Sequence, residues 1–171
     1  MAPEADLATR LVAALRRRGE TVATCESLTA GLVAAEIATV PGASAVLRGG
    51  LVTYATELKT TVAGVDPRVI GRFGVVSRET AQAMAAGARS VCGAAWGVAT
   101  TGVAGPEVVD GLPPGTVCVA VSGAGRVVSE QVALVGDRAS IRRGSVTAVL
   151  EILLAEVGRG RTVGAPASPG G

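Results

Sequence analysis

The spacing of apolar residues switches repeatedly between helical and strand periods along the chain. Leu7, Leu11, Val12 and Leu15 recur every three or four positions, which is typical of one face of an amphipathic helix. The same reasoning predicts helices at residues 3–18, 28–39, 56–63, 77–92 and 137–157, with a short one after Asp66-Pro67. Five short β-prone runs predict strands at residues 21–25, 46–54, 95–100, 117–122 and 127–134.

This alternation of helices and strands predicts an α/β layered domain. A length of 171 residues suits a single domain, which we expect to span residues 1–157. Residues 158–171 are rich in Gly, Pro, Ala and Ser and lack an apolar period, so we expect a disordered tail there.

Composition and charge narrow the classes of partner. A formal net charge of +2 with scattered arginines does not favour nucleic-acid binding. The start of the chain is polar and acidic, and no uninterrupted apolar stretch is long enough for a membrane helix. Cys25, Cys92 and Cys118 lie far apart in apolar surroundings, as expected of reduced core cysteines in a cytoplasmic protein. Alanine-rich helix faces are compatible with a homodimer.

Lys59 is the only lysine, and the chain has no histidine. Arginine stays protonated at any workable pH, whereas burial can turn a lysine into a general base. Proton transfer near neutral pH therefore depends on Lys59, a carboxylate, a tyrosine or a cysteine. Histidine-based triads and histidine-based zinc sites are excluded.

Three segments at predicted element junctions are candidates for chemistry. In the first, Ser27 follows a strand and precedes a helix, so it is either a helix N-cap or a nucleophile beside helix N–H groups. The second segment is the run from Gly49 to Lys59, in which Lys59 is either a solvated charge or a base surrounded by apolar residues. Tyr54 is either a core phenol or a site residue that converges with Lys59. Gly50 interrupts the preceding strand where the backbone can approach a ligand closely.

The third segment is the Gly-rich stretch from Thr100 to Pro106, which follows a buried strand. Its backbone N–H groups and the Thr101 hydroxyl can contact a phosphate or an oxyanion, although such a sequence also forms an ordinary turn. Thr101 and Gly102 are the candidates in this segment for contacting an anionic group.

The ordered set of these segments resembles the CinA C-terminal domain family of competence/damage-inducible proteins. The resemblance covers roughly residues 5–157, and it rests on Glu26-Ser27-Leu28-Thr29-Ala30-Gly31, Val40-Pro41-Gly42-Ala43-Ser44, Gly49-Gly50-Leu51-Val52-Thr53-Tyr54, Glu57-Leu58-Lys59, Gly74-Val75-Val76-Ser77, Thr101-Gly102-Val103-Ala104-Gly105-Pro106, Gly115-Thr116-Val117, Gly136-Asp137-Arg138 and Ile141-Arg142.

The resemblance implies a three-layer α/β/α fold with a mixed, mostly parallel sheet of about five strands. It also implies hydrolysis of the carboxamide of nicotinamide mononucleotide, a pyridine nucleotide, without a metal or organic cofactor. Ser27 would be the nucleophile, Lys59 the base and Tyr54 a neighbouring site residue. Thr29, Gly31, Thr101 and Gly102 fall on substrate-lining motifs. Arg142 and the Thr101-Gly102 turn are the candidates for holding the phosphate of that substrate. Larger family members carry a further N-terminal domain, so this chain resembles the stand-alone form.

Two departures from the family pattern bear on function. Residues 107–114 lack the paired glycines and the lysine that are common there, and Ala30 replaces a common glycine. The altered loop favours an alternative, a non-catalytic module that binds a nucleotide or a partner protein. Phosphoester hydrolysis is a weaker alternative, because the sequence shows no clustered carboxylates for metal ions.

Overall fold

The computed structural model describes residues 6–160. Its strands are β1 (Val22–Glu26), β2 (Leu47–Val52), β3 (Trp96–Gly102), β4 (Thr116–Gly123) and β5 (Arg126–Ala133). Its α-helices are α1 (Leu7–Arg18), α2 (Leu32–Ala38), α3 (Thr56–Thr61), α4 (Pro67–Phe73), α5 (Arg78–Cys92) and α6 (Arg138–Arg159). A short 3₁₀ helix, η1, spans Ala43–Ala45.

The five strands form one mixed sheet in the order β2-β1-β3-β4-β5. Strand β1 pairs in parallel with β2 and with β3, whereas the β3–β4 and β4–β5 pairs are antiparallel. The expected mixed five-stranded sheet is confirmed, with its parallel part confined to three strands. Glu26, the last residue of β1, lies opposite Val52 of β2 and Thr100 of β3. The carboxyl ends of all three parallel strands therefore meet at one edge, where open α/β sheets bind their ligands.

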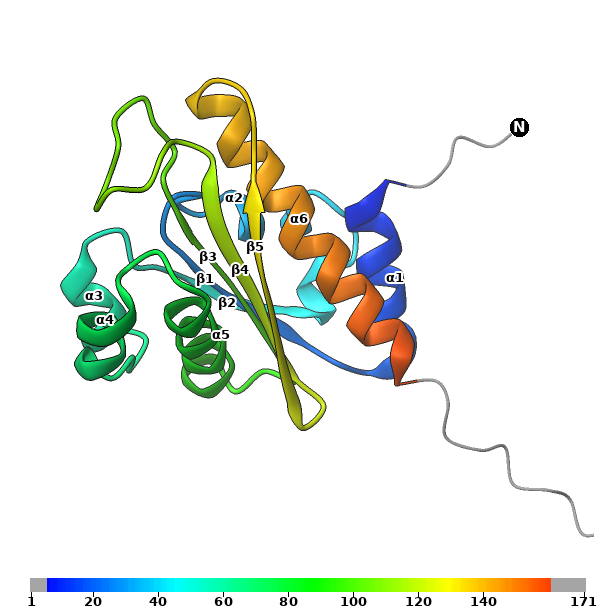
Figure 1. Ribbon diagram of the computed structural model, residues 1–171. Coiled ribbons are helices and arrows are strands. Elements are labelled where there is room, and N and C mark those ends of the chain that lie inside the picture. The colour runs from blue at the N-terminus through cyan, green and yellow to red at the C-terminus, as the bar shows by residue number, and fades with distance from the viewer. Residues whose placement is uncertain (1–5, 161–171) are drawn as a thin grey trace, which may run out of the picture.

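Helices cover both faces of the sheet, which confirms the three-layer α/β/α arrangement. Helices α1, α2 and α6 lie on one side, and α3, α4 and α5 lie on the other (Figure 1). The connection from β1 to β2 runs through α2 on the first side. The connection from β2 to β3 runs through α3, α4 and α5 on the second side. The two connections thus leave opposite faces of the sheet next to the carboxyl end of β1.

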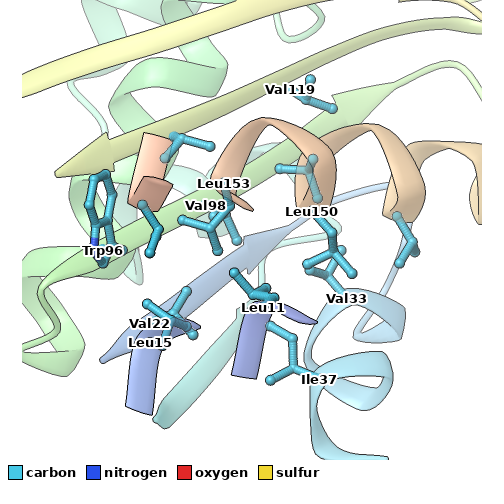
Figure 2. Close-up of a cluster of buried hydrophobic side chains, with 14 of the residues drawn as sticks. Leu11, Leu15, Val22, Val33, Ile37, Trp96, Val98, Val119, Leu150 and Leu153 are labelled. Carbon is cyan, nitrogen blue, oxygen red and sulfur yellow. The ribbon is translucent and has the colours of Figure 1, made fainter. Parts of the chain in front are cut away.

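The larger core fills the space between the sheet and helices α1, α2 and α6. Branched aliphatic side chains from all of these elements meet there, with Trp96 at one end (Figure 2). The Trp96 indole N–H is not left unpaired, because it donates to the Glu20 carboxylate over 2.7 Å. Burial of these side chains is the main source of stability on this side of the sheet.

The core on the opposite face consists mostly of small side chains under α5. Ala81, Ala85 and Ala88 of the helix face Ala23, Ala99 and Ala120 of the sheet. Small residues let the helix approach closely. At Gly97 of β3 there is no room for a Cβ, because it would clash with the backbone carbonyl oxygen of Ala85. This close helix–sheet contact leaves no room for aromatic side chains beneath this part of α5.

The predicted starts of α3, α4, α5 and α6 agree with the structure, whereas α1 and α2 begin later than predicted. Helix α1, expected from residue 3, begins at Leu7, after its N-cap Asp6. The side chains of Asp66, Ser77 and Asp137 each accept a hydrogen bond from the first turn of α4, α5 and α6. The helix expected from residue 28 begins only at Leu32. The delay has a physical cause, because Ala30 and Gly31 both adopt positive φ angles that a right-handed helix cannot contain.

In the C-terminal half, the observed elements agree closely with those predicted from the sequence. Strands β4 and β5 form the expected hairpin, joined by Ala124-Gly125, and both turn residues have the positive φ of a type I′ turn. Helix α6 ends at Arg159, two residues beyond the expected position. From residue 161 onward, the expected disordered tail lies outside the described residues. Within residues 6–160, no helix combines the length and apolarity that a membrane crossing requires.

Candidate functional site

Ser27 and Lys59 meet at the carboxyl end of β1. Ser27 follows directly on the strand, and its backbone N–H donates to the Thr100 carbonyl of β3 over 2.9 Å. Lys59 lies on α3, and its Nζ donates to Ser27 Oγ over 3.1 Å and to the Thr53 carbonyl over 2.7 Å. A hydroxyl within hydrogen-bond distance of an amine is the arrangement that a serine nucleophile and its base require.

The Lys59 side chain is fully buried, although it carries an amine. Burial lowers the pKa of Lys59, because an ammonium loses its hydration in the protein interior; nearby Cys25 and Glu57 partly oppose this effect. A lowered pKa increases the neutral fraction near pH 7. Of the two roles that the sequence left open for Lys59, a solvated surface charge is wrong.

The neighbouring thiol does not compete with Ser27 as a nucleophile. Burial raises the pKa of Cys25 to about 11, so its sulfur stays protonated at neutral pH. Its Sγ lies 3.4 Å from the Thr53 hydroxyl, in the same buried layer as the lysine.

The turn that carries Ser27 is held by the buried carboxylate of Glu26. Its Oε2 accepts hydrogen bonds from the Thr29 hydroxyl and from the Gly31 and Val33 amides, at 2.6, 2.9 and 3.0 Å. Its Oε1 accepts from the Thr24 hydroxyl at 3.0 Å and the Ala34 amide at 2.9 Å. A carboxylate at a helix N-terminus also interacts favourably with the helix dipole. Glu26 therefore caps α2, and the alternative role of Ser27 as the N-cap is wrong.

This capping leaves two amides next to Ser27 without an acceptor. The Ala30 amide donates to the Ser27 carbonyl, and those of Gly31, Val33 and Ala34 donate to Glu26. The amides of Leu28 and Thr29 have no hydrogen-bond acceptor in the part of the chain that the structure describes, and both residues are buried. Paired backbone N–H groups beside a nucleophile are the usual components of an oxyanion hole.

Ser27 and Lys59 open onto a cavity of about 440 Å³. The loop from Val103 to Asp110 forms one wall, and Tyr54 and Arg138 lie on another part of the lining. Within this loop, Val109 and Leu112 exchange two backbone hydrogen bonds, so residues 109–112 form a small hairpin. A hollow of about 660 Å³ between α1 and α6 is larger, but alanines and arginines dominate its lining. The smaller cavity holds the dyad and has the size of a small-molecule site.

The structure separates the predicted site residues into two groups. Ser27, Tyr54, Lys59, Thr101 and Gly102 all line the cavity. The other four are not part of its lining and instead lie behind the turn, in strand β2 or on α6: Thr29, Gly31, Gly50 and Arg142.

Each residue of the second group has a contact that supports the site from behind. The Thr29 hydroxyl is shared between Glu26 and Thr100, and the Gly31 amide donates to Glu26. Arg142 donates to the carbonyl oxygens of Leu28 and Thr29, at 2.9 and 3.1 Å. Gly50 lies beside the Thr24 side chain, where a Cβ would come within 2.7 Å of the Thr24 hydroxyl.

Sequence reasoning missed Arg138 as a lining residue. Its Nη2 donates to Tyr54 Oη over 2.9 Å, and its Nη1 donates to the Gly105 carbonyl over 2.7 Å. The available signal was the Gly136-Asp137-Arg138 segment, whose aspartate is a recognisable helix cap. Glu107 and Asp110 of the altered loop also line the cavity.

The polar groups of the cavity do not form a metal centre. No group of three His, Cys, Asp or Glu side chains in residues 6–160 is placed to hold a metal ion. The functional groups at the cavity include the Ser27 hydroxyl, the Lys59 amine, the Tyr54 phenol, the Arg138 guanidinium, two threonine hydroxyls and two carboxylates.

Comparison with known proteins gives some relatives that are much longer than this chain and others of about the same length. A CinA-like protein from Frankia casuarinae is 47% identical over 81% of this chain, which spans only 32% of that protein. The chain thus covers about a third of the first CinA-like relatives. The nicotinamide-nucleotide amidohydrolase PncC of Pseudomonas putida is 44% identical, with 90% of this chain matching 97% of that protein.

Solved structures and a family model agree with these relatives. The competence/damage-inducible protein CihA from Agrobacterium tumefaciens superimposes with a TM-score of 0.84 at 37% identity, covering 87% of this chain and 92% of that one. A CinA superfamily protein from Klebsiella pneumoniae gives a TM-score of 0.86 at 30% identity, covering 90% and 96%. The model of the CinA C-terminal domain matches residues 4–157. The chain therefore belongs to the CinA C-terminal domain family.

Proposed function

We propose that this protein is a nicotinamide-nucleotide amidase. It hydrolyses the carboxamide of nicotinamide mononucleotide to nicotinate mononucleotide and ammonia, with Ser27 as nucleophile and Lys59 as base. The contact of 3.1 Å between the buried Lys59 amine and the Ser27 hydroxyl carries the proposal. The name of the Pseudomonas putida relative, a nicotinamide-nucleotide amidohydrolase, supports the choice of substrate.

The first half of the reaction forms an ester. Neutral Lys59 accepts the Ser27 proton while Oγ attacks the carboxamide carbon. The carbonyl oxygen becomes an oxyanion, which the free amide of Leu28, a residue of the cavity lining, stabilises by about 3 kcal/mol. The Lys59 ammonium then gives its proton to the amide nitrogen, the C–N bond breaks and ammonia leaves.

The second half releases the acid. A water molecule in the place of ammonia loses a proton to Lys59 as it attacks the ester carbon. Collapse of this second oxyanion breaks the bond to Ser27, and Lys59 returns the proton to Oγ. The sum is one amide and one water converted to one carboxylic acid and one ammonia. Thr53 keeps the lysine in place throughout, because its carbonyl accepts from Nζ over 2.7 Å.

The proposal is tested by incubating the protein with nicotinamide mononucleotide and measuring ammonia and nicotinate mononucleotide. We expect both products in equal amounts. The alternative of a non-catalytic module rests on the altered loop of residues 107–114, within which residues 109–112 form the small hairpin. A ligand-induced rise in melting temperature without ammonia release would support that alternative and contradict the amidase.

Two further expectations accompany the proposal. We place the protein in the cytoplasm, since its three cysteines are free and two of them are fully buried. The homodimer stays a prediction, which light scattering on the purified protein would test.

A further inference from the structure

Arg138 is placed differently from the other arginines near the site. It lies in the first turn of α6, and its guanidinium lines the cavity that holds Ser27 and Lys59. The nearby Arg142 is committed to two backbone carbonyls behind the Ser27 turn. No ion pair among residues 6–160 involves Arg138, so its charge is not neutralised by a carboxylate of the described chain.

The guanidinium is held in place and still has donors to spare. Its two hydrogen bonds go to the Gly105 carbonyl and the Tyr54 hydroxyl. A guanidinium has five N–H donors in one plane, so others remain available. Tyr54 accepts the bond from Arg138, which leaves its own O–H free to donate. The two side chains together therefore present N–H and O–H donors around a fixed positive charge.

The distribution of charge in the cavity favours anion binding beside Arg138 and Tyr54. Lys59 is buried at the base and must be neutral to act on Ser27, so it is not a phosphate ligand. Glu107 and Asp110 on the loop wall would repel an anion. Arg138 is the one permanently charged cation that lines the cavity within the described chain. Arginine is also the side chain best suited to phosphate oxygens.

We propose that Arg138, with the Tyr54 hydroxyl, binds the phosphate of the substrate. The inference rests on the proposed function, because it needs the carboxamide carbon at Ser27. In a pyridine mononucleotide the ribose separates the carboxamide from the phosphate. With the ring at Ser27 the phosphate therefore reaches outward, to the half-exposed side where Tyr54 lies. Arg138 is accordingly a specificity-determining residue, which selects nucleotides over nucleosides.

The experiment compares two substrates that differ only in the phosphate. Ammonia release is measured from nicotinamide mononucleotide and from nicotinamide riboside, with the wild-type protein and with Arg138→Met. Arg143→Met is the matched control, because Arg143 is exposed on the same helix and does not line this cavity. Melting temperatures of all variants establish that they are folded.

We expect Arg138→Met to lower kcat/KM for the nucleotide by about 30-fold or more, mainly through KM, with a change of less than about threefold for the riboside. Arg138→Lys should recover part of the loss, and Arg143→Met should match the wild type. Equal losses on both substrates would mean that Arg138 only holds Tyr54 and Gly105, and would overturn the inference. No loss on either substrate would overturn it as well.

A binding measurement separates this inference from the proposed function. Calorimetric titration of the Ser27→Ala protein with nicotinamide mononucleotide needs no turnover. We expect Arg138→Met in that background to weaken nucleotide binding by about 30-fold and to leave riboside binding unchanged. A wild-type protein without amidase activity would contradict the proposed function. Equal nucleotide binding by the Ser27→Ala protein with and without Arg138→Met would contradict the role of Arg138.

Discussion

At the scale of single residues, the site depends on placing one amine where water cannot stabilise its charge. Lys59 is fully buried, and its Nζ has a serine hydroxyl and a backbone carbonyl as partners. Neither partner carries a charge, so nothing in direct contact compensates the lost hydration. The resulting fall in pKa is what allows a lysine to replace the histidine that this chain lacks.

The lowered pKa of Lys59 predicts how activity depends on pH. The protonated amine cannot accept the Ser27 proton, so kcat/KM should rise with pH and level off once Lys59 is neutral in the free enzyme. The midpoint should fall below the ordinary lysine pKa of about 10.4. Nicotinamide riboside is the better substrate for this profile, because it has no phosphate that titrates. Activity that falls as the pH rises would contradict a lysine base.

Because Glu26 caps α2, we expect the conservative substitution Glu26→Gln to have a large effect on stability. Glu26→Gln replaces one carboxylate oxygen by an NH₂ group, which faces donors instead of acceptors at the start of α2. We expect the free energy of unfolding to fall by about 3 kcal/mol. Glu36→Gln on the exposed side of the same helix is the control and should change it by less than about 0.5 kcal/mol. If urea unfolding gave the same loss of unfolding free energy for Glu26→Gln and Glu36→Gln, the capping role of Glu26 would be contradicted.

At the scale of elements, the turn between β1 and α2 shows where local sequence signals fail. A serine before an alanine-rich stretch looks like an N-cap, so the sequence predicts a helix from residue 28. The actual cap is the side chain of the last strand residue, which reaches forward to Gly31 and beyond. A cap from the preceding strand has no fixed spacing in the sequence, so no local pattern reveals it.

The backbone of this turn allows a direct test. Ala30 has a φ of 49°, a left-handed conformation that costs an alanine about 1 kcal/mol. In Ala30→Gly the relief of this strain offsets the greater freedom of glycine in the unfolded chain, so stability should stay within about 0.5 kcal/mol of the wild type. Ala35→Gly, within α2, should lower it by about 1 kcal/mol. Similar losses in both variants would contradict the turn geometry.

The contact between α5 and β3 gives a second prediction at this scale. Gly97→Ala places a methyl group against the Ala85 carbonyl of the helix, so we expect a loss of about 3 kcal/mol in unfolding free energy. Gly71→Ala on α4 is the control, because a Cβ at that position would have no atom within 4 Å. That substitution should stabilise the protein by about 0.5 kcal/mol. A tolerated Gly97→Ala would mean that the helix is free to move away from the sheet.

At the scale of the whole molecule, the parallel strands decide where the site forms. Ser27 follows β1, Thr53 and Tyr54 follow β2, and Thr101 and Gly102 end β3. Strand order places these three strands side by side, so their carboxyl ends deliver all five residues to one edge. The order of elements was readable from periodicity, and the family resemblance supplied the sheet type and the roles expected of Ser27 and Lys59.

What the sequence did not reveal depends on contacts over long distances along the chain. Tyr54 and Arg138 are 84 positions apart, yet Arg138 Nη2 donates to Tyr54 Oη over 2.9 Å. From the sequence, Arg142 was the predicted anion ligand, and it lies one helical turn after Arg138. Only the packing of α6 against the Ser27 turn decides which of the two arginines lines the cavity.

The most direct test of the account is the rate of ammonia release from nicotinamide mononucleotide by Ser27→Ala and Lys59→Met. Ser44→Ala and Arg72→Met are controls, because both residues are exposed and neither lines the cavity. We predict that each site variant stays folded and loses kcat/KM by on the order of 1,000-fold or more, while both controls match the wild type. A folded Ser27→Ala or Lys59→Met protein with wild-type activity would contradict the serine–lysine mechanism.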